Sequence, residues 1–79
     1  MTRPDYTKRQ CEILDLLCMG YTQQEIAKYL KLSYRTIQTT INRLRYKHGC
    51  VTVAHLASKY TQYKMILKII KENNNDNRR

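Results

Sequence analysis

One stretch of the chain places several hydrogen-bonding side chains at helical spacing. Within residues 34–48, five polar side chains fall on one side of a helical wheel, opposite the apolar ones, and none of them is acidic. They are Arg35, Gln38, Thr39, Asn42 and Tyr46. The carboxamides of Gln and Asn can pair with adenine, a guanidinium can pair with guanine, and a Thr methyl can pack on the thymine methyl. We therefore expect bases in the major groove of double-stranded DNA to be read by Arg35, Gln38, Thr39 and Asn42.

A second group of side chains around this face is suited to phosphate. Cations, hydroxyls and the free amides at the start of a helix are the usual ligands of the DNA backbone. No Asp or Glu occurs between Glu25 and Glu72, and at least eight basic residues do, so positive charge gathers where phosphate would lie. The predicted phosphate ligands are Thr22, Ser33, Thr36, Arg43, Arg45, Tyr46 and Lys47.

Charge and length limit the classes of function. The chain has 79 residues, enough for one small domain, and a formal net charge of +9. An excess this large favours a polyanionic partner, with nucleic acid first and an anionic membrane surface second, over charge that serves solubility alone. The longest strongly apolar run, 65–67, lies between lysines and is far shorter than the roughly 20 residues of a membrane span. The start of the chain lacks a secretion signal, which predicts a cytoplasmic protein.

Cysteine and histidine spacing argues against metal or enzyme chemistry. The three cysteines, Cys11, Cys18 and Cys50, form no C-x-x-C pair, and their odd number does not suit a disulfide framework. His48 and His55 are seven apart, and no carboxylate is placed to orient either one. We expect no catalytic residue, no metal, no cofactor and no small-molecule ligand.

Caps and apolar spacing define the first two helices. Thr7 with Gln10, and Thr22 with Glu25, have the capping-box spacing that starts a helix. Apolar residues then recur every three or four positions, and Gly20 is a natural stop. The sequence predicts a helix that starts at Thr7 and a short helix after Thr22.

A third and a fourth helix follow from the same signals. Ser33 is a good cap after a tight connection and predicts a helix over 34–48 that Gly49 ends. Its buried face would carry Ile37, Ile41 and Leu44. Thr52 starts a pattern that extends to about residue 72, either as one long helix or as two pieces broken near 61–62. No strand pattern occurs, so the predicted fold class is all-α.

The organisation predicted from this pattern has four parts. They are an irregular arm (1–6), a helix-turn-helix domain (7–60), a helical extension (61–72) and a disordered polar tail (73–79). The apolar stripe of the last helix predicts a homodimer, because it is more area than one small bundle covers. The alternative is that 61–72 fold back on the monomer core. The expected dimer residues are Leu56, Tyr60, Tyr63, Ile66, Leu67 and Ile70.

Four segments resemble the DNA-binding domain of LuxR/GerE-type regulators. Residues 7–14 are similar to the family's opening helix, 20–30 to its Gly-x-Ser-Asn-x-Glu-Ile-Ala-x-x-Leu, 32–37 to its Ile-Ser-x-x-Thr-Val, and 47–50 to its Lys-Leu-Gly-Val. The resemblance implies a four-helix bundle whose third helix reads DNA and whose fourth commonly joins two copies. It implies a stand-alone, GerE-like regulator of transcription, bacterial or phage. Where the family often has Lys, this chain has Gln38, which weakens the expectation of guanine contacts.

Two other classes of function compete with DNA reading. One is a small protein-interaction module, such as an inhibitor, an adaptor or a protein that binds RNA polymerase. Region 4 of bacterial sigma factors has a similar helix-turn-helix, but the break at 49–50 and the fourth helix fit LuxR/GerE better. The other is a basic amphipathic helix, 59–72, on a membrane surface, for which a dimer interface is the simpler use.

Overall fold

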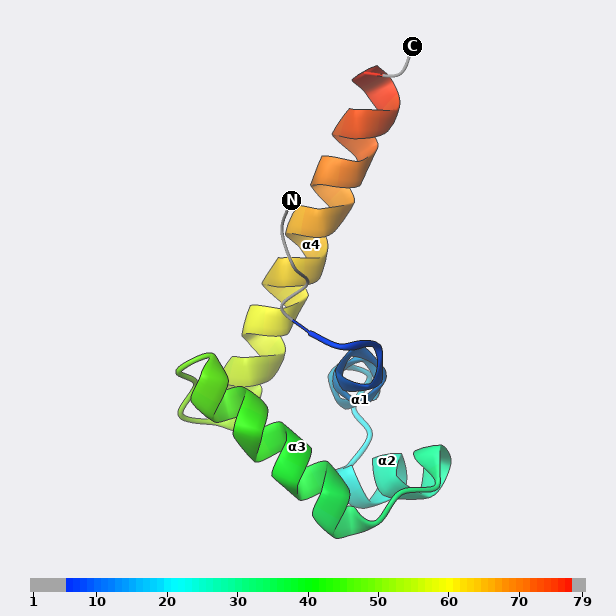
Figure 1. Ribbon diagram of the computed structural model, residues 1–79, viewed down its shortest axis with the longest axis vertical. Coiled ribbons are helices and arrows are strands. Elements are labelled where there is room, and N and C mark those ends of the chain that lie inside the picture. Colours follow the sequence, from blue (N-terminus) through cyan, green and yellow to red (C-terminus); the bar gives the residue numbers. More distant parts are fainter. Residues whose placement is uncertain (1–5, 78–79) are drawn as a thin grey trace.

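The computed structural model describes residues 6–77, and it describes side chains as far as Glu72. Within that range the chain forms four helices and no strand: α1 (Lys8–Cys18), α2 (Gln23–Leu30), α3 (Tyr34–Lys47) and α4 (Val53–Asn77) (Figure 1). The all-α prediction is therefore confirmed. Residues 1–5 of the expected arm and 78–79 of the expected tail lie outside the described residues.

Each helix begins at the hydroxyl residue that the sequence predicts. Thr7 and Thr22 form complete capping boxes, with their hydroxyl oxygens accepting from the amides of Gln10 and Glu25 at 3.1 Å. The Ser33 hydroxyl accepts from the Thr36 amide at 3.0 Å, and Thr52 accepts from the His55 amide at 3.0 Å. These bonds satisfy amides that a helix start leaves without partners.

The first three helices end in the same way, at a residue with left-handed backbone conformation. Gly20 (φ 99°), Lys31 (φ 59°) and Gly49 (φ 66°) follow α1, α2 and α3. After each of them the next amide turns back to the last turn of the helix, as in the bond of 2.8 Å from the Cys50 amide to the Arg45 carbonyl. Lys31 is the one non-glycine residue of the described chain that adopts this conformation.

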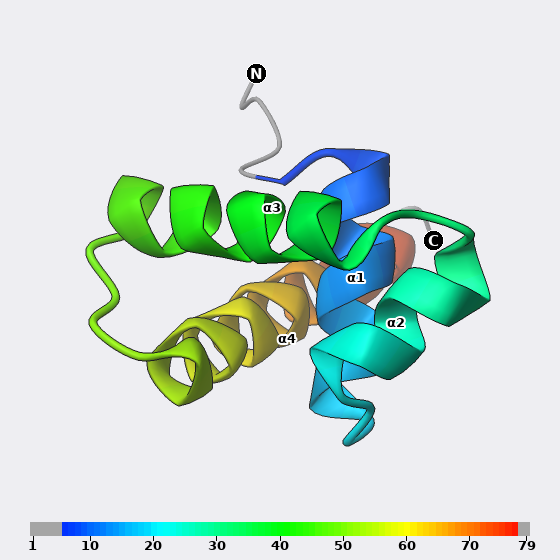
Figure 2. The ribbon, with the colours of Figure 1, turned by 90° about the horizontal axis from the view of Figure 1, so that it is seen from below.

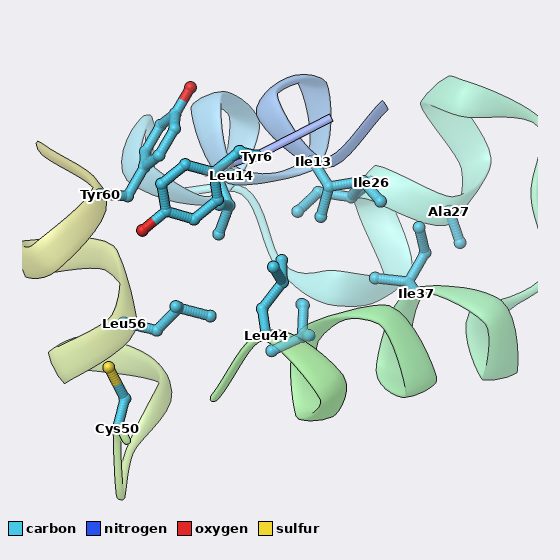
Figure 3. Packing of buried hydrophobic residues seen from close by; sticks show 11 residues of the cluster. Tyr6, Ile13, Leu14, Ile26, Ala27, Ile37, Leu44, Cys50, Leu56 and Tyr60 are labelled. Atoms are coloured by element: carbon cyan, nitrogen blue, oxygen red, sulfur yellow. The ribbon is translucent and has the colours of Figure 1, made fainter. Parts of the chain in front are cut away.

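The core lies where the four helices meet (Figure 3). The inner face of α3 points toward side chains of α1, α2 and the start of α4. Tyr6, which the sequence assigned to an irregular arm, is in fact buried, with its ring stacked on His48 at 4.7 Å and edge-on to Tyr60 at 5.1 Å. The buried residues are Tyr6, Ile13, Leu14, Ile26, Ala27, Ile37, Ile41, Leu44, Cys50, Leu56 and Tyr60.

Helix α4 is one continuous helix that projects well beyond the bundle (Figure 1). It passes 61–62 without a break and ends at Asn77, so the expectation of disorder from residue 73 is wrong for 73–77. A polar Asn-rich segment without Gly or Pro continues the helical hydrogen bonds that precede it. None of the helices in the described chain combines the length and the apolar character that crossing a membrane requires.

The structure divides the predicted dimer stripe into two parts. Leu56 and Tyr60 are 0% and 1% exposed inside the monomer core, and the half-buried Tyr63 packs against that core. Leu56 and Tyr60 are therefore corrected from dimer residues to core residues. Of the segment 61–72, only the start contacts the core, and residues 65–72 do not fold back on it, because their apolar side chains stay exposed. They are Met65, Ile66, Leu67, Ile69 and Ile70, at 47–59% exposure.

Candidate DNA interface

Helix α3 lies on the outside of the bundle, and its outer face is uncovered. In Figure 2, which views the molecule from below, no other helix lies in front of α3. Its inner residues Ile37, Ile41 and Leu44 are at most 1% exposed, so the rotation of the helix about its own axis is fixed by the core. All four predicted base-reading residues are exposed on the opposite side: Arg35, Gln38, Thr39 and Asn42.

Hydroxyl groups gather at the start of α3. The Ser33 and Thr36 hydroxyl oxygens lie 2.8 Å apart, and Ser33 also caps the helix. Thr22 performs the same capping for α2. A hydroxyl that accepts a backbone hydrogen bond can still donate its own hydrogen. Capping and phosphate binding are therefore compatible at Thr22 and at whichever of Ser33 and Thr36 accepts the bond between them.

The far end of α3 presents cations and one exposed aromatic ring. Arg43 and Lys47 are exposed, and Tyr46 is 91% exposed on the same side as Asn42. The end of the helix is held in place by the bond of 3.0 Å from the Lys59 ammonium to the His48 carbonyl. Sequence reasoning missed this role of Lys59, because it depends on how α4 lies beside the end of α3.

Arg45 has a different position from the one that the sequence predicted. It is half-buried, and its guanidinium donates to the Asn42 side-chain oxygen at 2.9 Å and to the Val51 carbonyl. Arg45 therefore joins α3 to the loop before α4, and its predicted contact with phosphate stays a prediction. The sequence carried no signal for this, because one of the two acceptors is a backbone carbonyl six residues away.

Comparison with families of known proteins bears on this arrangement directly. Residues 5–59 of the 79-residue chain match the GerE model, described as bacterial regulatory proteins of the luxR family. The chain belongs to the luxR family. Searches of the curated proteins and of the solved structures found no significant match.

Membership of the luxR family identifies the general activity of the domain. The luxR-family domain is a helix-turn-helix of DNA-binding regulators. The match extends from before α1 into the first turns of α4 and includes α2, the turn at Lys31 and α3. The projecting part of α4 lies beyond it.

Proposed function

We propose that this luxR-family protein is a sequence-specific regulator of transcription that inserts α3 into the major groove of double-stranded DNA. The observation that carries the proposal is the outer face of α3, where polar and non-acidic side chains lie exposed directly opposite a fully buried face. A major groove about 12 Å wide admits one helix of this kind. The proposed base-reading residues are Arg35, Gln38, Thr39 and Asn42.

Residues on either side of this face are proposed to hold the two DNA backbones. The hydroxyls lie at the starts of α2 and α3, where free amides also favour an anion. Exposed cations and a phenol lie toward the far end of α3. Backbone contacts of this kind set register and affinity without selecting sequence. The proposed phosphate ligands are Thr22, Ser33, Thr36, Arg43, Tyr46 and Lys47.

We further propose that two copies pair through the projecting part of α4. The apolar side chains there, Ile66, Leu67 and Ile70 with Met65 and Ile69, have no cover in the monomer. Exposed Lys64, Lys68 and Lys71 share one side of the helix beside this surface, and they are suited to a solvated rim. A pair of α3 helices related by a two-fold axis would read half-sites about one helical turn apart.

The proposed DNA partner also indicates where the protein acts. A bacterial DNA-binding regulator works in the cytoplasm, where the chromosome lies. A second function, binding to RNA polymerase, is favoured by the same exposed apolar part of α4, because part of this area could serve a protein partner other than a second copy.

Selection of bound duplexes from a random pool tests the proposal. A sequence reader of this size should enrich a short motif, and a dimer should enrich it as an inverted repeat. A protein-interaction module would leave the pool unchanged. A single motif without an inverted repeat would support base reading by α3 and would contradict the proposed dimer.

A further inference from the structure

The guanidinium of Arg45 joins a predicted base-reading side chain to the backbone of a loop. Its Nη1 donates to Asn42 Oδ1 at 2.9 Å, and its Nη2 donates to the carbonyl of Val51. The two nitrogens belong to one planar fork, so the bond to the loop carbonyl also sets the direction of the bond to Asn42. The position of the Asn42 carboxamide is thus linked to the fold of residues 49–51.

The loop that orients Arg45 is itself well anchored. The Cys50 amide donates to the Arg45 carbonyl at 2.8 Å, and the Cys50 side chain is buried at 5% exposure. Arg45 is half-buried, and its Nε is buried without a hydrogen-bond partner among the described residues. The guanidinium therefore has little freedom to leave Asn42 and reach outward.

The chemistry of the pair fixes which way round the Asn42 amide lies. A guanidinium is only a donor, so the atom of Asn42 that faces it must be the oxygen. The Nδ2 group is then the one left for DNA. We propose that Arg45 is a positioning residue that makes Asn42 read DNA as a hydrogen-bond donor.

A donor at this position selects among bases in a defined way. Paired recognition of adenine needs the Asn oxygen to accept from the adenine amino group, and here that oxygen already accepts from Arg45, which holds it turned toward the guanidinium. The guanidinium charge also repels an amino group that approaches it and attracts the guanine O6 atom. Resting on the proposed major-groove function, we infer that Asn42 prefers guanine over adenine.

Binding-site selection with variants of the pair tests this inference. The base position that Asn42 reads is the one whose preference disappears in Asn42→Ala. At that position the wild type should favour guanine, and Arg45→Met should raise the ratio of adenine to guanine by about tenfold, which lies within the range for one paired contact. Arg45→Lys keeps a donor and should retain most of the guanine preference.

Two further backgrounds separate positioning from a merely structural role. In Asn42→Ala, adding Arg45→Met should leave the remaining base preferences unchanged. If Arg45 only held the loop, Arg45→Met would weaken binding to every duplex alike and leave the ratio of adenine to guanine as it was. If Arg45 read a base itself, adding Arg45→Met to Asn42→Ala would remove a further base preference. Either result overturns the inference.

A measurement on the free protein keeps this inference separate from the proposed function. In nuclear magnetic resonance spectra, Arg45→Met should shift the side-chain amide signals of Asn42, and Gln62 provides an exposed reference amide on α4. Unshifted Asn42 signals would refute the pairing even if the protein reads DNA. Shifted signals with no enriched motif would instead refute the DNA-reading proposal.

Discussion

The hydroxyl of Tyr60 donates a hydrogen bond of 2.7 Å to the Asp15 carboxylate and thereby joins α4 to α1. The Lys64 ammonium lies 2.9 Å from the same oxygen. Tyr60 is buried while Asp15 is half-buried, so the carboxylate lies at the edge of the core. The point where α4 leaves the bundle is thus held by one acid and two donors from α4.

This arrangement predicts how stability depends on pH. Burial raises the pKa of Asp15, but hydrogen bonds from Lys64 and Tyr60 and the charge of Lys64 outweigh it, so the pKa lies below its ordinary value of 3.8. Stabilisation by the ionised carboxylate is therefore present above pH 3.8 and is lost as pH falls through the lower folded value. The hydrogen bond to Asp15 raises the pKa of Lys64, so that contribution is lost only at strongly alkaline pH.

Asp15→Asn should lower the free energy of unfolding at pH 7 by about 1 kcal/mol, because the bonds to a charged acceptor are lost at a partly exposed site. Urea unfolding at neutral and acid pH measures this. The difference between the variant and the wild type should shrink in acid, where the wild-type carboxylate is also neutral. An equal difference at both pH values would contradict the account of this contact.

Replacing Lys31 with glycine is expected to stabilise the fold. Its φ of 59° is costly for a side chain with a Cβ and easy for glycine, so Lys31→Gly should stabilise the fold by about 0.5–1 kcal/mol. Lys28→Gly is the matched control, since it removes the same charge from inside α2, and it should destabilise by a similar amount. Thermal unfolding measures the stability of both variants. If both destabilise the fold, the expectation that Lys31→Gly stabilises it is wrong.

The base-reading role of α3 predicts a loss that depends on sequence. Gln38→Ala should weaken binding to the selected duplex by about 1–3 kcal/mol and relax the preference at one base position. Gln62→Ala removes the same exposed side chain from α4 and should change neither the affinity for the selected duplex nor the base preference. The measurement is the affinity of each variant for the selected duplex and for a scrambled duplex. An equal loss of affinity on both duplexes would show that Gln38 does not read a base.

Phosphate contacts predict a change in salt dependence. Arg43→Ala should weaken binding to all duplexes and lower the slope of affinity against salt by about 1, since one fewer phosphate is neutralised. Lys71→Ala loses the same charge on the projecting part of α4 and should leave the slope unchanged. Titrations at several salt concentrations distinguish them. Equal slopes for Arg43→Ala and the wild type would exclude Arg43 from the interface.

The exposed part of α4 predicts a dimer that one charge disrupts. Ile70 is 49% exposed, so Ile70→Glu should leave the monomer folded and helical while it removes the dimer and weakens DNA binding. Gln62→Glu adds the same charge to the same helix and should leave the dimer intact. Sedimentation at tens of micromolar protein reports the assembly. A wild type that is monomeric there would reject the interface.

Much of the fold could be predicted because it depends on neighbours in sequence. Thr7, Thr22 and Ser33 cap residues three positions away, and Gly20 and Gly49 provide the left-handed turns. The same local rules located α3 and, through its period, the exposed face that carries the candidate site. These features need no knowledge of how the helices pack.

The features that were missed depend on how helices and loops pack, which helical spacing does not show. Tyr6 looked like part of an arm, but it packs on His48 and Tyr60. Tyr60 belongs to the same apolar stripe as Ile70, and only the packing of α4 on α1 shows that one is core and the other is exposed. Arg45 has the composition of a phosphate ligand, and the position of a loop carbonyl gives it another role.

The ratio of two dissociation constants tests the central claim most directly. One is measured on the selected duplex and the other on a mixed-sequence duplex of equal length, at about 0.15 M salt. Sequence-specific reading by α3 predicts that the selected duplex binds at least about 1,000-fold more tightly, with steep salt dependence on both. Equal affinity for the two duplexes, or no binding to either, would contradict the claim.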